Sequence, residues 1–187
     1  MDEALQKAVL AKVQQTPIGQ QIVQYLLARK SLPQFKETYT GDRGSFDYNT
    51  WAGNELPPQG RVSLRGGAEA DASTMLHELT HAADRQLAEQ YFEIPRGQRN
   101  SQFAQGFEKL SLNSTEKGRS ARNMVAQALA GNWAKERQEY RASSPELAAF
   151  GVGNSAAPPG VNRGPLHVDP TMATEMAILL ELASRKK

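Results

Sequence analysis

The chain has 187 residues, of which 39% are hydrophobic and 22% charged, and its formal net charge is +2. This length suffices for one domain with a sizeable core, and the composition is that of an ordinary globular protein. Charges of both signs are mixed along the chain, with no basic block of the kind that binds nucleic acid. The sequence contains no cysteine, which excludes disulfides and thiolate metal sites and leaves histidine and carboxylate as metal ligands.

The first 30 residues predict two helices. Apolar residues recur at helical spacing in 2–15 and again in 17–29. Between them, Thr16 predicts an N-cap and Pro17 a first helical position. Charges run throughout this segment, and no stretch of the chain is apolar over a membrane-spanning length, so we expect neither a secretory signal nor a membrane partner. We expect synthesis in a cytoplasm; delivery into another cell or packaging in a virion is compatible with this.

Residues 33–66 predict three short strands. The runs 33–40, 44–51 and 60–66 are alternating or β-branched and are separated by Gly, Pro, Asn and Asp. Two glycines then turn the chain, and Asp71 or Ser73 can cap a long helix that continues to about Phe92.

The remainder predicts further helices. We expect mostly loop with room for one short helix over 93–116, a helix over about 119–137, a short helix from Pro145, a long connection over 151–168 and a last helix within 169–187. The active-site helices are expected within 69–150. Helices, a small sheet and helices again predict a single α+β domain spanning residues 1–187.

The predicted long helix carries His77-Glu78-Leu79-Thr80-His81. Residues four apart share one helix face, so both imidazoles can bind one ion. Zinc accepts imidazole and in catalytic sites keeps one position for water, whose proton Glu78 could take as general base. The competing interpretation is a solvated helix face or a buried histidine pair. Two of the three histidines of the chain lie in this motif, which favours a Zn²⁺ site.

A catalytic zinc site needs a third protein ligand from elsewhere in the chain. The candidates are Glu89, Glu93, Glu139, Glu146, Glu175 and His167. Glu89 points along its own helix, and Glu93 lies just before the chain departs at Pro95. The long connection separates His167 and Glu175 from the motif, so the segment 137–151 is left. Small residues beside Glu146 would let a helix there approach the motif helix closely.

The motif resembles that of the zincin metallopeptidases whose third ligand is glutamate. The letters HELTHA match the thermolysin family, and the continuation to Asp84 gives HExxHxxD, which is more similar to the families of anthrax lethal factor and the Mlc titration factor. In those families a tyrosine precedes the third-ligand glutamate by six intervening residues; Tyr140 and Glu146 are similar with one residue fewer. The resemblance implies a zincin-like fold and zinc-dependent hydrolysis of peptide bonds in a peptide or protein substrate. It also implies His77, His81 and Glu146 as ligands, Glu78 as base and Tyr140 as oxyanion stabiliser, a core tyrosine being the alternative for Tyr140.

Two other residues near the motifs have candidate roles. Asp84 could accept the second ring N–H of a ligand histidine, or it could form a surface ion pair with Arg85 or Lys135. Arg141 could bind substrate carbonyls or hold Glu146 in place, and simple exposure is the alternative.

Zincins commonly bind an extended substrate by strand addition at the sheet edge above the motif helix. The resemblance therefore implies a substrate-binding strand, for which the run 61–64, with Val62 and Leu64, is the candidate. A strand at this place would also exist in a protein without a substrate.

The main alternative to a peptidase is a zincin-like fold used as a structural or assembly subunit, for example in a phage particle, with little or no turnover. Such a subunit would have a homo-oligomeric or assembly partner. A peptidase delivered into another cell as an effector, a phage-encoded enzyme and a housekeeping bacterial enzyme would share these sequence features. Both histidines and Glu78 are intact, which favours the enzyme.

Overall fold

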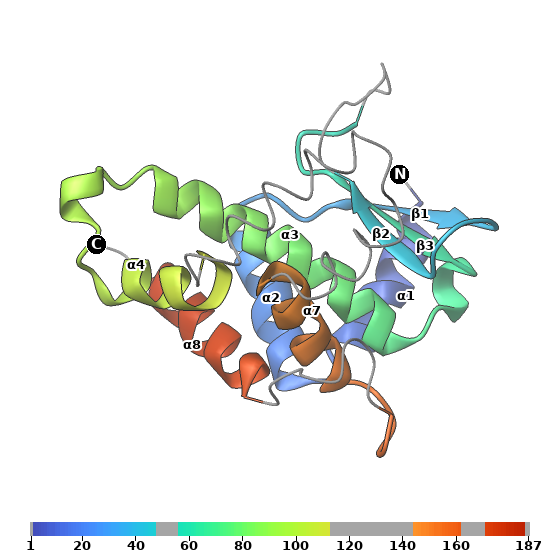
Figure 1. Ribbon diagram of the computed structural model, residues 1–187. Coiled ribbons are helices and arrows are strands. Elements are labelled where there is room, and N and C mark those ends of the chain that lie inside the picture. The colour runs from blue at the N-terminus through green and yellow to red at the C-terminus, as the bar shows by residue number, and fades with distance from the viewer. Residues whose placement is uncertain (1, 48–55, 113–143, 162–170, 186–187) are drawn as a thin grey trace, which may run out of the picture.

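The computed structural model describes residues 2–47, 56–112, 144–161 and 171–185, and these form a mixed α+β arrangement (Figure 1). The elements are α1 (Glu3–Val13), α2 (Pro17–Ala28), β1 (Gln34–Thr38), β2 (Gly44–Asp47), β3 (Arg61–Arg65), the 3₁₀ turn η2 (Gly67–Glu69), α3 (Ala72–Phe92), the 3₁₀ turn η3 (Arg96–Gln98), α4 (Gln102–Phe107), the π-helical turn η4 (Glu108–Leu112), α7 (Ser144–Asn154) and α8 (Met172–Ser184). The predicted α+β class is confirmed. Within these ranges, no helix has both the length and the apolar character needed to cross a membrane.

The two predicted N-terminal helices are confirmed, and their break lies where the sequence placed it. The Thr16 hydroxyl accepts a hydrogen bond from the Gly19 amide at 3.1 Å, and Pro17 is the first helical residue. A Cβ at Gly19 would lie 2.0 Å from the Val13 carbonyl oxygen, so the start of α2 packs directly on the end of α1. The missing side chain allows this tight reversal.

The three predicted strands form one sheet in the order β1-β3-β2. β1 runs parallel to β3, and β2 runs antiparallel to it. Phe35 and Phe46 both pair with Val62, so these three side chains share one face of the sheet. Alternate residues of a strand point to opposite faces, and Leu64 therefore faces the same way as Val62; both are fully buried. This apolar face packs against α1 and α3.

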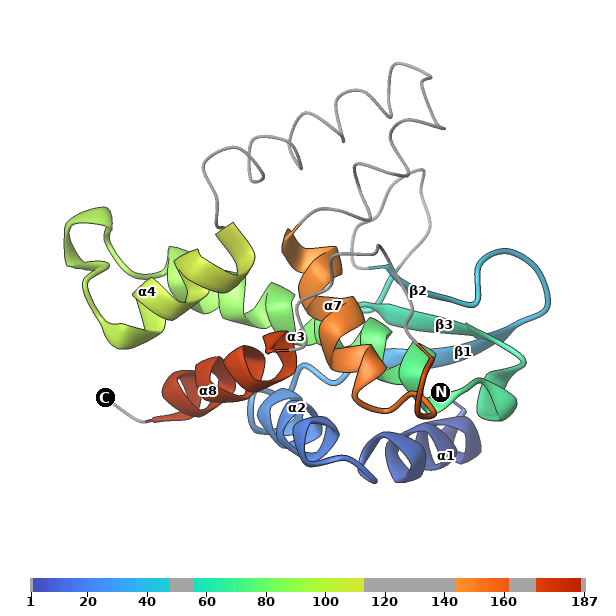
Figure 2. The same cartoon turned by 60° about the horizontal axis from the view of Figure 1, so that its bottom comes forward.

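α3 is the central element of the fold and lies between the sheet and the helices α2 and α8 (Figures 1 and 2). Asp71 is its N-cap, because its Oδ1 accepts a hydrogen bond from the Thr74 amide at 2.9 Å. The helix then continues through Phe92, as predicted. Its most extensive contact is with α7, and it also touches α1, α2, α4, α8, β2 and β3.

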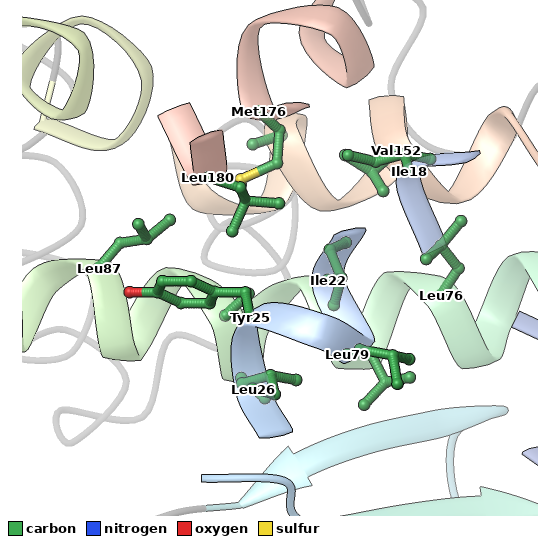
Figure 3. Packing of buried hydrophobic residues seen from close by; sticks show 14 of the residues in the cluster. Ile18, Ile22, Tyr25, Leu26, Leu76, Leu79, Leu87, Val152, Met176 and Leu180 are labelled. Atoms are coloured by element: carbon green, nitrogen blue, oxygen red, sulfur yellow. The ribbon is translucent and has the colours of Figure 1, made fainter. Parts of the chain in front are cut away.

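The core lies where α2, α3, α7 and α8 meet (Figure 3). Its fully or almost fully buried side chains include Ile22, Leu26, Leu76, Leu79, Leu87, Val152, Met176 and Leu180. A short polar chain ties three of these helices at one end: the Tyr25 hydroxyl donates to Gln90 Oε1 at 3.2 Å, and Gln90 Nε2 donates to the Ala183 carbonyl at 3.1 Å.

The second half of the chain is more helical than predicted. The segment after Glu93, expected to be mostly loop with one short helix, contains α4 and directly after it η4, and these bury Phe103, Phe107 and Leu110. The predicted connection from 151 is wrong over its first four residues, because α7 continues to Asn154. Gly153 lies where α7 packs against α3, and an added Cβ there would be 2.9 Å from the Ser73 carbonyl oxygen. The missing side chain therefore allows the two helices to pack closely.

Two predictions about the second half concern segments that are only partly described. The predicted helix over 119–137 lies outside the described residues, as does the predicted start of the last helix at 169. α8 is described from Met172, with Thr171 as its N-cap, and it buries Met176, Leu179, Leu180 and Ala183. The prediction of a C-terminal helix is confirmed.

Candidate metal centre

α3 places the two histidines of the HELTH motif side by side. Their Nε2 atoms are 3.1 Å apart, and the rings meet edge to face with centroids 4.8 Å apart. One turn of helix separates the two residues, so the spacing itself produces this meeting. The side chains of His77 and His81 are 14% and 15% exposed, so both rings keep a narrow opening to solvent.

α7 brings Glu146 to the same point. Its Oε2 lies 3.4 Å from His77 Nε2, and its Oε1 lies 3.0 Å from His81 Nε2. The approach depends on small side chains, because Ala148 and Ala149 of α7 are buried. Of the candidates for the third ligand in the described residues, Glu146 is the one whose carboxylate meets both imidazoles.

Glu78 is buried beside the two histidines. His77, Glu78 and His81 form a group that could hold a metal ion, with one potential ligand atom from each and all of these within 4.8 Å of one another. Oxygens of Glu146 also lie within 3.4 Å of the Nε2 atoms of His77 and His81. Two carboxylates, Glu78 from α3 and Glu146 from α7, thus lie close enough to the histidine pair to complete a donor set.

The charges of the site are coupled. Burial raises the pKa of the Glu78 carboxyl, and the nearby His81 and His77 oppose this rise only in part. Burial also disfavours ionised Glu146, but hydrogen bonds from His77 and His81 outweigh it and hold the pKa of that carboxyl well below its usual range. Burial would lower the pKa of His81, yet the hydrogen bond to Glu146 and the charges of Glu146, Glu78 and Asp84 raise it. The two glutamates thus differ in character: Glu146 is held as a carboxylate, and Glu78 is biased towards accepting a proton.

The donor set fits zinc. Four ligands at about 2.0–2.1 Å from a tetrahedral zinc lie about 3.3–3.4 Å from one another. The three separations among His77 Nε2, His81 Nε2 and the Glu146 oxygens are 3.1, 3.4 and 3.0 Å. The two nitrogens meet different oxygens of Glu146, so the carboxylate bridges the pair of imidazoles at separations close to those of metal ligands. Two imidazoles and one carboxylate are also a donor set that zinc accepts in catalytic sites.

Two residues at the site were not identified from the sequence. Phe150 of α7 packs its ring on His77, with centroids 4.5 Å apart. Gly44 of β2 lies against Glu78, and a Cβ there would be 2.8 Å from Glu78 Cγ and Oε1. A glycine within a strand indicates a close approach of another group, so a contact at Gly44 could have been predicted from the sequence, although not the residue that makes it. Phe150 carried none, because its position depends on how α7 packs.

The other predicted site residues are placed as follows. Tyr140 and Arg141 lie outside the described residues, as do Lys135, Glu139 and His167. Asp84 is half-buried, and its charge acts on His81 as described above. Glu89 forms an ion pair with Arg85 at 3.0 Å, Glu175 forms one with Lys109, and Glu93 is an exposed C-cap. None of these last three glutamates faces the histidines.

The candidate substrate strand 61–64 needs correction. β3 is the central strand, with β1 on one side and β2 on the other, so its backbone is already paired along both edges. Val62 and Leu64 are fully buried in the core and cannot contact a substrate. The strand next to α3 with an edge turned away from β3 is β2. No short-range pattern indicates that the last strand inserts between the first two.

Comparison with known proteins adds no relative: no family model matches the chain, no match was found among curated proteins, and none was found among solved structures. Any functional assignment therefore depends on the geometry of the site.

Proposed function

We propose that the chain is a zinc-dependent peptidase with His77, His81 and Glu146 as metal ligands and Glu78 as general base. The observation that supports this is the convergence of three donors at 3.0–3.4 Å, from two separate helices, beside a buried glutamate whose pKa is raised by burial. A histidine pair on a solvated helix face would not be met by a buried carboxylate from α7.

The proposed roles follow from the positions of the side chains. A bound zinc would supply a water of lowered pKa and polarise the scissile carbonyl. Glu146, held as a carboxylate, completes the ligand set together with the two imidazoles. Glu78 stands beside that set, accepts a proton from the nucleophilic water and returns it to the leaving amine. Tyr140 stays the candidate for stabilising the oxyanion.

The substrate is proposed to bind along β2. Edge strands present unpaired amide and carbonyl groups that can pair with an extended peptide. β2 packs against α3, and its residue Gly44 touches Glu78, so a peptide added there would pass directly over the motif helix. Binding through backbone groups suits an unfolded polypeptide.

Metal content tests the ligand set first. Elemental mass spectrometry after dialysis should find about one zinc per folded chain of wild type. Glu146→Ala should lose most of it, because two ligands hold zinc poorly. Glu175→Ala is the matched control, since that glutamate pairs with Lys109 at the surface and should leave the zinc in place. Wild type that takes up no zinc, even when zinc is added back, would contradict the ligand assignment.

Hydrolysis of an unfolded protein such as casein tests the role of Glu78. Glu78→Gln should retain zinc and lose about 10²–10⁴-fold in kcat, because the amide cannot accept the proton. The exposed Glu89→Gln, on the same helix, should cleave at the wild-type rate. Undiminished cleavage by Glu78→Gln would refute the assignment of the base. Zinc binding without any cleavage by wild type would favour a structural or assembly role.

A further inference from the structure

The start of β2 lies so close to α3 that residue 44 has no room for a side chain. A Cβ at Gly44 would lie 2.8 Å from Glu78 Cγ, 2.8 Å from Glu78 Oε1 and 2.9 Å from Thr74 Cγ2. Gly44 does not have a positive φ, so any residue could adopt its backbone conformation. The requirement for glycine is therefore one of space, and the group that fills the space is the side chain of Glu78.

β2 cannot easily move away from Glu78. Gly44 is paired with Leu64 in the antiparallel ladder, and Leu64 is fully buried. Lifting the strand would open the ladder and uncover core. On the other side, α3 is held by its packing against α7 and the rest of the core. The backbone of β2 and the two histidines thus enclose the carboxylate of Glu78 between two rigid elements.

We propose that Gly44 is a positioning residue, whose missing side chain lets the backbone of β2 fix the carboxylate of Glu78 beside the metal ligands. This inference rests on the proposed function for its catalytic consequence, although the contact itself does not. An added methyl group would be accommodated by the most mobile of its neighbours. A glutamate end can rotate, whereas a strand in a ladder cannot, so the Glu78 side chain would be displaced while the fold persists.

The test is Gly44→Ala, with Gly97→Ala as the matched control. A Cβ at Gly97 meets no atom within 4 Å, and its φ is not positive, so this variant carries the same change in chain entropy without a contact. Gly44→Ala should bind zinc at wild-type stoichiometry, because none of the three ligands is touched. Its kcat on casein should fall about 10²-fold with little change in KM, as expected when a catalytic group is misplaced by about 1 Å.

A spectroscopic measurement tests the contact without relying on activity. The ¹³Cδ resonance of Glu78, assigned by its absence in Glu78→Gln, should shift in Gly44→Ala and stay in place in Gly97→Ala. If wild type neither binds zinc nor cleaves casein, the proposed function fails, and this shift still decides whether Gly44 positions Glu78. An unchanged resonance in folded Gly44→Ala would overturn the inference.

A second variant separates the two clashes. Gly44→Ala/Thr74→Ser removes the threonine methyl that an alanine would meet and keeps the hydroxyl that donates to Asp71. If Gly44→Ala folds poorly, this variant relieves part of the overlap and can be measured in its place. The displaced Glu78 signal and the low kcat should persist in it. Recovery of both to wild-type values would show that Gly44 makes room only for Thr74 and would overturn the proposal.

Discussion

The two flanks of α3 differ in how they are built. One flank presents Leu76, Leu79 and Leu87 to α2 and α8, and all three are fully buried (Figure 3). The other flank presents His77, Glu78 and His81 to α7 and β2, and it is met by the Glu146 carboxylate, the Phe150 ring and the backbone of β2. Successive residues of a helix are about 100° apart, so one motif of five residues supplies both flanks.

The difference shows how stability and chemistry are divided within a single helix. Buried apolar area stabilises the fold wherever it lies, and volume decides how much. The site flank depends instead on specific atomic contacts. The Glu146 carboxylate meets His81, and the missing side chain of Gly44 leaves room for Glu78. We therefore expect changes to the core flank to alter the free energy of unfolding and changes to the site flank to alter zinc binding or turnover.

The largest effect on stability is expected from Leu79→Ala, which leaves a cavity between α3 and α2. The free energy of unfolding should fall by about 2–5 kcal/mol in urea denaturation. Leu27→Ala is the control, because Leu27 is 53% exposed and its truncation should change stability by about 0.5 kcal/mol or less. Folded Leu79→Ala should still hold one zinc. Loss of zinc from the folded variant would show that the two flanks are not separable.

Removal of the metal should have a smaller effect. A ligand that binds only the folded state at 100 times its Kd stabilises it by about 2.7 kcal/mol. Chelation should therefore lower Tm while the chain stays folded, because the core flank contains none of the ligands. The shift should vanish in Glu146→Ala and persist in Glu175→Ala. Complete unfolding on chelation, seen by circular dichroism, would mean that the core depends on the site.

The core flank and the sheet were largely predictable because each depends on a short-range pattern. Helical spacing predicts α1 and α2, a glycine turn and a capping residue predict the start of α3, and alternating or β-branched runs predict the strands. Side-chain chemistry predicts the Thr16 cap and offers Asp71 or Ser73 for the long helix; Thr16 and Asp71 are the caps. The order of the strands is not predictable in the same way, because strand pairing joins residues distant in sequence. The expectation that residues 61–64 form a sheet edge is wrong for this reason.

The site flank was predictable only within α3. Spacing alone brings His77 and His81 together, whereas the approach of Glu146 depends on α7 packing against α3. The resemblance to glutamate-ligand zincins, not periodicity, pointed to Glu146. Gly44 and Phe150 touch the motif from other elements, and no local pattern relates either of them to residues 77–81. Contacts made by tertiary packing are those that sequence periodicity leaves open.

The smallest effect on stability is expected at Asp71, the N-cap of α3, because it stabilises the start of the helix that carries both flanks. Asp71 accepts from the Thr74 amide at 2.9 Å and from its hydroxyl at 3.0 Å. Asp71→Ala should lower the free energy of unfolding by about 1 kcal/mol, whereas Asp71→Asn keeps an acceptor and should change it much less. Because His77 lies more than one helical turn after Asp71, zinc content should not change in either variant. If Asp71→Ala loses zinc at a temperature where it is folded, the start of α3 sets the position of the metal ligands. Stability and zinc binding would then not be separable along α3.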